Sequence, residues 1–75
     1  MAFDSNAFGH RLMVIRNDRK MSQRDLAAAT GIGYSAIARY EKGSVIPQVD
    51  TLCVIADALN CTTDQLVGRE AFVVA

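Results

Sequence analysis

The sequence predicts an all-α fold, a bundle of five helices in one domain. Two observations support this: apolar residues recur at helical spacing along the longer segments, and residues that start or stop helices stand between those segments. A chain of 75 residues is long enough for one core, which buries about 60–65% of its unfolded surface. We expect a single domain over residues 1–75, with its core at about 5–68 and a short apolar tail at 69–75.

The first helix is expected over residues 5–20. Either Asp4 or Ser5 can cap its start, because both side chains carry an oxygen that accepts from free backbone N–H groups. Its buried stripe follows the helical period and consists of Phe8, Leu12 and Ile15.

Two short helices joined by a tight turn are expected after residue 21. Ser22 can cap the first of them, and Asp25, three residues later, can complete a capping box. Gly31 stands where this helix must stop, since the residue after a last turn often adopts a left-handed backbone. Gly33 can start the next helix.

This next helix, residues 34–42, has two different faces and ends at Gly43. Ile37 and Tyr40 lie three residues apart and face inward. An outward face is shared by Tyr34, Ser35 and Arg39. Two helices with a glycine-bearing turn and an exposed second helix are typical of a helix-turn-helix.

The remaining chain predicts a loop and two more helices. Residues 44–47 form the loop, whose final proline prevents the preceding helix from continuing. The fourth helix spans about 49–59 and stops at Asn60. Thr62 and Gln65 make a second capping box for a short fifth helix. The fourth helix carries an apolar face of Leu52, Ile55, Ala56 and Leu59.

Charge is segregated along the chain although the formal net charge is zero. Residues 11–42 hold seven basic and three acidic residues, a balance of +4, and the rest holds one basic and five acidic residues, a balance of −4. Such segregation gives a local positive field, which favours nucleic acid as a partner. A solvated helical surface with an uneven charge distribution is the alternative.

Several classes of protein are not expected. No segment approaches the ~20 apolar residues of a membrane span, and the first six residues lack the basic start of a signal peptide, so we expect a cytoplasmic protein with no membrane partner. His10, Cys53 and Cys61 lack metal-ligand spacing, and we expect no metal, no cofactor and reduced cysteines. With one histidine and no nucleophile–base arrangement, an enzyme is not expected.

The order and spacing of these residues resemble the phage repressor and Cro family, which has the lambda-repressor-like fold. The resemblance covers about residues 8–68 and implies that the second and third helices form the helix-turn-helix. The matching residues are Arg16, Met21-Ser22-Gln23, Leu26-Ala27, Gly31-Ile32, Ile37, Glu41, Gly43, Pro47, Thr51-Leu52, Ile55-Ala56 and Ala58-Leu59.

The resemblance implies that residues 34–42 are a recognition helix in the major groove, with Tyr34, Ser35 and Arg39 as its base-reading residues. Arg39 can bond a guanine through two N–H groups. Ser35 can bond several bases and so specifies weakly. Tyr34 either packs on a thymine methyl or bonds a phosphate.

The resemblance also implies phosphate contacts. Gln23 begins its helix, where amide hydrogens and the positive end of the dipole favour an anion, and Lys42 is the next candidate. Arg11 and Arg24 are weaker candidates, for which a plain solvated role is the alternative.

Arg16 falls where the family carries an arginine that pairs with the glutamate at Glu41. This pair would tie the first helix to the end of the third. A phosphate contact by Arg16 is the alternative.

The expected function is a transcription regulator, a repressor that binds an inverted repeat in double-stranded DNA as a homodimer. No small-molecule effector is expected. The tail Phe72–Ala75 is either a frayed end or a surface that packs on a partner. An adaptor or antitoxin that binds protein is the alternative function, in which the tail and Met13-Val14 would matter more than Arg39.

Overall fold

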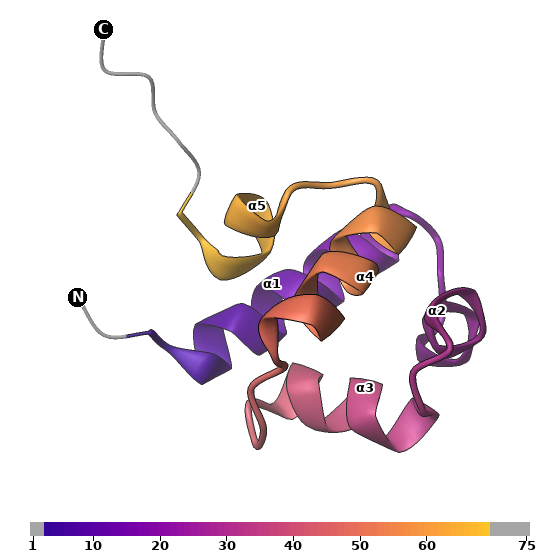
Figure 1. Cartoon of the computed structure of the whole chain (residues 1–75), viewed down its shortest axis with the longest axis horizontal. Helices are drawn as coiled ribbons and strands as arrows, with labels where there is room; N and C mark the ends of the chain where they lie inside the picture. Colours follow the sequence, from indigo (N-terminus) through magenta and orange to yellow (C-terminus); the bar gives the residue numbers. More distant parts are fainter. Residues whose placement is uncertain (1–2, 70–75) are drawn as a thin grey trace, which may run out of the picture.

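The computed structural model describes residues 3–69 and contains five helices, with no strand in that range. This confirms the predicted all-α, five-helix fold (Figure 1). The predicted tail Phe72–Ala75 lies outside the described residues. The helices are α1 (Ser5–Asp18), α2 (Gln23–Thr30), α3 (Tyr34–Lys42), α4 (Val49–Leu59) and α5 (Thr63–Val67).

One apolar core holds the helices together. Helix α1 packs on α3 and α5, while α2 packs on α3 and α4, so each helix contributes to the same interior. The buried apolar residues recur at helical spacing, as the sequence predicts, with Ile15 only partly buried at the edge. They are Phe8, Leu12, Leu26, Ile37, Tyr40, Ile55, Ala56, Leu59 and Leu66.

Local capping defines the helix starts. Asp4 is the N-cap of α1 and accepts from two backbone N–H groups, those of Asn6 and Ala7. The ring of Phe3, just before the cap, lies 5.8 Å from the ring of Phe8, which is the hydrophobic staple that fixes how a chain enters a helix. Both predicted capping boxes, those of α2 and α5, are present.

The predicted end of the first helix was wrong by two residues. Helix α1 ends at Asp18 rather than at residue 20, because Lys20 adopts a left-handed backbone with φ of 59°. The N–H of Lys20 donates to the carbonyl of Asn17, and the N–H of Met21 donates to that of Arg16. These two bonds form a Schellman motif, which here contains no glycine to indicate it in the sequence.

Helix α1 approaches the end of α3 very closely at Gly9. A Cβ atom added to Gly9 would lie 2.6 Å from the carbonyl oxygen of Tyr40, and still closer to that of Glu41. Real Cβ atoms do not come this close to backbone, so this position requires glycine. The contact fixes the C-terminal half of α3 against α1 and leaves the other face of α3 uncovered.

Candidate nucleic-acid interface

Helix α3 lies at one side of the molecule, opposite α5 (Figure 1). Ile37 is fully buried and Tyr40 is 9% exposed, which anchors one face of α3 in the core. The predicted base-reading residues Tyr34, Ser35 and Arg39 are all exposed. The structure therefore brings these three side chains to one free helix face.

Arg24, in the first turn of α2, contacts Tyr34, the first residue of α3. The guanidinium carbon of Arg24 stands 4.6 Å from the ring centre of Tyr34, within the distance of a cation–π contact. This contact covers one face of the Tyr34 ring, and Tyr34 is still 44% exposed. Sequence reasoning missed the pair because the two residues stand ten positions apart in different helices.

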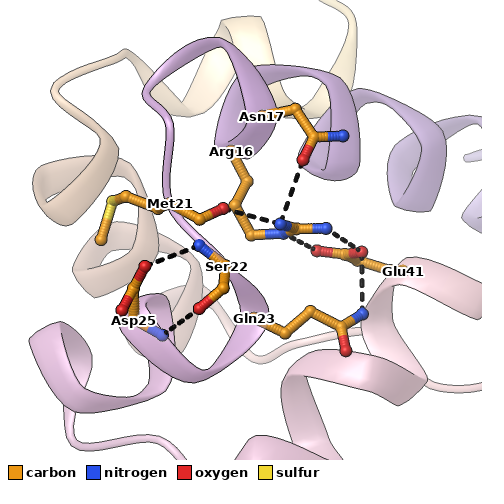
Figure 2. Close-up of polar contacts among 7 residues, drawn as sticks. All are labelled: Arg16, Asn17, Met21, Ser22, Gln23, Asp25 and Glu41. Carbon is orange, nitrogen blue, oxygen red and sulfur yellow. Dashed lines mark hydrogen bonds and ion pairs between the residues drawn. The ribbon is translucent and has the colours of Figure 1, made fainter.

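Arg16 and Glu41 form a buried ion pair at the back of this surface (Figure 2). Nε of Arg16 lies 2.6 Å from Oε2 of Glu41, and Nη2 lies 3.1 Å from Oε1. Their side chains are only 10% and 6% exposed. The hydrogen bond to Glu41 raises the pKa of Arg16 above its ordinary value, against the opposing effect of burial.

Three further groups bond this pair, the first being Oδ1 of Asn17, which accepts from Nη1 of Arg16 at 3.2 Å. Nη1 of Arg16 donates to the carbonyl of Met21 at 2.7 Å, which holds the turn between α1 and α2. Nε2 of Gln23 donates to Oε1 of Glu41 at 3.0 Å. Glu41 therefore accepts from α1 and α2 at once and fixes the start of α2 against the end of α3 (Figure 2).

The predicted phosphate-binding residues are not all in one place. Gln23, Arg24 and Lys42 belong to α2 and α3, and Arg24 and Lys42 are exposed. The side-chain amide of Gln23 carries two N–H groups, and one of them donates to Glu41. Arg11 lies elsewhere. It follows Gly9 by two residues and is therefore about 200° around α1 from the side that packs on α3. Its guanidinium stands against Gly68, which follows α5.

Arg19, one of the basic residues in the positive half of the chain, is also engaged in the fold. Its Nε donates to the carbonyl of Leu59 at 2.7 Å, and its Nη2 lies 3.4 Å from the carbonyl of Asn60. The positive guanidinium thus satisfies carbonyls at the C-terminal end of α4, where a cation is favoured. Arg16 and Arg19 are therefore structural, and the remaining cations carry the free positive charge.

The described residues contain no group of three or more potential ligands that could hold a metal ion. Within the same range, no helix has the length and apolar character needed to cross a membrane. A cleft of about 390 Å³ lies on the α1–α5 side, lined by His10, Arg11, Val14, Ile15, Arg19, Cys61 and Gln65. Burial raises the pKa of the Cys61 thiol there, with Arg19 opposing the change.

Comparisons with known proteins agree with this geometry. The family model described as helix-turn-helix matches residues 12–66. The transcriptional regulator AnsR of Bacillus subtilis is 37% identical over 60 residues, which is 80% of this chain and 52% of AnsR. The immunity repressor of Bacillus phage phi105 is 32% identical over 65 residues, which is 87% of this chain and 45% of the repressor. This chain thus spans about half the length of these curated relatives.

Solved structures share the fold. The restriction-modification controller protein C.AhdI of Aeromonas hydrophila is 28% identical, with a TM-score of 0.81 over 84% of this chain and 96% of that protein. The P22 c2 repressor, crystallised with synthetic operator 9T, is 27% identical, with a TM-score of 0.78 over the same shares of the two chains. These similarities confirm the resemblance to phage repressors and the fold class predicted from the sequence.

Proposed function

The chain belongs to the helix-turn-helix family, and we propose that it is a sequence-specific DNA-binding regulator of transcription, a repressor that binds an inverted repeat as a homodimer. The observation that carries this proposal is the free face of α3, on which Tyr34, Ser35 and Arg39 are exposed while the opposite face is locked in the core. The repressor relatives support the choice of repression.

In the proposed complex, α3 enters the major groove. A helix of about 10–12 Å diameter fits the groove width of about 12 Å. Arg39 has no salt-bridge partner among residues 3–69, so its guanidinium is available to bond O6 and N7 of a guanine. Because Arg24 already covers one face of Tyr34, Tyr34 offers a base its free face or its hydroxyl.

The phosphate contacts would come from the start of α2 and the end of α3. Gln23 and Arg24 stand at the start of α2, where backbone N–H groups and the helix dipole favour an anion. Lys42 is the last residue of α3. Phosphate contacts of this kind supply affinity and register, whereas base contacts supply the preference for a sequence.

Pairing of two copies would overcome the small area of one recognition helix. A twofold pair on an inverted repeat engages two half-sites about 34 Å apart, one turn of the duplex. Each copy then contributes the same contacts, which raises both the affinity and the length of the recognised sequence.

Selection of bound sequences from a random duplex pool tests the proposal. The wild-type protein is expected to recover an inverted repeat. The Arg39→Ala variant is expected to lose preference for one guanine per half-site, a discrimination of about 1–3 kcal/mol. Arg69→Ala is the matched control, because Arg69 is also exposed but follows α5 and lines a cleft with Ala7 and Arg11 that no residue of α3 lines.

Three results would contradict the proposal. Recovery of no motif at low salt, where phosphate attraction is strongest, would favour the alternative function of an adaptor or antitoxin that binds protein. Recovery of a single unrepeated site would contradict the homodimer. An unchanged motif with Arg39→Ala, in a variant that still folds, would contradict the role given to Arg39.

A further inference from the structure

Arg24 of α2 and Tyr34 of α3 are in contact at the edge of the proposed DNA surface. The guanidinium carbon of Arg24 lies 4.6 Å from the ring centre of Tyr34. Both side chains line the same hollow of about 360 Å³ beside the start of α2. Both residues are exposed, so their contact adds nothing to the core and any role it has belongs to the surface.

The carboxylates around the start of α2 are already engaged, which explains why Arg24 contacts a ring. Asp25 accepts from the backbone N–H of Ser22 at 2.9 Å in the capping box. Glu41 accepts from the side chains of α1 and α2 described above (Figure 2). Arg24 has no ion-pair partner among residues 3–69. No carboxylate in that range therefore competes with a phosphate for the N–H groups of its guanidinium.

We propose that Arg24 positions Tyr34 for base recognition, so that the Tyr34 ring packs on the 5-methyl group of a thymine while Arg24 binds a neighbouring phosphate. The inference rests on the proposed DNA-binding function and deepens it. It chooses between the two partners that the sequence leaves open for Tyr34, a thymine methyl group and a phosphate.

The chemistry of the two side chains decides which of them meets which group. A guanidinium bonds a phosphate through charge-assisted hydrogen bonds, which are about twice as strong as those between neutral groups. Of a cation and a tyrosine in contact, the cation is therefore the better phosphate ligand. The ring is left for the base edges, which the first residues of a recognition helix reach. There the thymine methyl is the apolar group that the major groove presents.

The contact with Arg24 also restrains the Tyr34 side chain. Tyr34 is the first residue of α3 and is 44% exposed. The preceding residue, Gly33, has no side chain that could hold the ring, and even an added Cβ there would meet nothing within 4 Å. The guanidinium supplies a restraint from the neighbouring helix. Without it the ring is freer to turn away from the base, and the methyl contact weakens although the fold is unchanged.

Replacement of thymidine by deoxyuridine tests this inference, because deoxyuridine lacks only the 5-methyl group. Fluorescence anisotropy measures binding of the full chain to the selected inverted repeat, with each thymine replaced in turn. We expect one thymine per half-site at which loss of the methyl group weakens wild-type binding by about threefold to fivefold. Tyr34→Phe, which keeps the ring, should retain this methyl effect, and Tyr34→Ala should abolish it.

Arg24→Ala separates positioning from phosphate attraction. It is expected to weaken binding to both duplexes and also to reduce the methyl effect to less than about twofold. Lys42→Ala is the matched control, because it also removes an exposed cation of the helix-turn-helix, but one at the last residue of α3 rather than beside Tyr34. It should weaken binding to both duplexes equally and leave the methyl effect as in the wild type.

The outcomes distinguish this inference from the proposed function. A wild-type protein that binds the repeat without any methyl effect would overturn the inference alone. So would a methyl effect that survives undiminished in Tyr34→Ala or Arg24→Ala. Equal weakening on both duplexes with Tyr34→Phe, with no methyl effect left, would assign the hydroxyl to a phosphate instead. Failure of the wild type to select any motif would overturn the proposed function and this inference together.

Discussion

Gly9 controls the distance between α1 and the end of α3. In Gly9→Ala the new methyl group would press on the carbonyl oxygens of Tyr40 and Glu41, which belong to the backbone and cannot rotate away. We expect the free energy of unfolding to fall by about 1–3 kcal/mol, the usual cost of overpacking, measured by urea unfolding.

Gly33→Ala is the control for this prediction. An added Cβ at Gly33 meets nothing within 4 Å, and its φ of −62° suits any residue. Its cost should stay below about 1 kcal/mol, the loss of a favourable N-cap residue. Equal destabilisation by the two substitutions would show that the close approach of α1 to α3 does not limit the side chain at position 9.

The buried ion pair predicts strong coupling between Arg16 and Glu41. Glu41→Leu leaves the buried guanidinium of Arg16 without its carboxylate, and Arg16→Met leaves that carboxylate without its cation. Each is expected to cost about 3–5 kcal/mol. The double variant should cost much less than the two together, because it removes both charges. Additive losses in urea unfolding would contradict a coupled pair.

These residue-scale features differ in how far the sequence could reveal them. The Arg16–Glu41 pair was expected only through the family resemblance, since its partners are 25 positions apart. The bond from Arg19 to Leu59 spans 40 positions, and nothing in the local sequence indicates it. The sequence also gave no indication that position 9 requires glycine, because the constraint comes from the backbone of α3.

At the scale of elements, two cations in the last turn of α3, Arg39 and Lys42, should act differently on DNA. Lys42→Ala is expected to weaken binding to all sequences alike and to reduce the slope of log K against log salt by about 1 per copy. Arg39→Ala should instead weaken binding mainly where the guanine is present. The measurement is a salt titration of specific and unrelated duplexes with each variant. A sequence-dependent effect of Lys42→Ala would contradict its role as a phosphate contact.

Helix boundaries were the part of the structure most open to prediction. Capping residues act on backbone groups within three or four positions, so Ser22, Gly31, Gly43 and Asn60 indicate their helix ends locally. The end of α1 was misjudged because Lys20 adopts a left-handed backbone without being glycine. That conformation is stabilised by backbone hydrogen bonds, and no residue type in the segment predicts them.

At the scale of the whole molecule, the charge distribution needed the structure to be interpreted. Residues 11–42 carry a balance of +4, but Arg16 and Arg19 are bound within the fold and Arg11 faces the α5 side. The cations near the free face of α3 are fewer than the sequence suggests. A modest count of cations per copy makes pairing of two copies more important for affinity.

Pairing also predicts that stability depends on protein concentration. If two folded copies bind each other and unfolded chains do not, a hundredfold rise in concentration should raise the thermal midpoint by about 5–10 °C for a domain of this size. Thermal scans of the wild-type protein over this range measure the effect, and a constant midpoint would contradict pairing in solution.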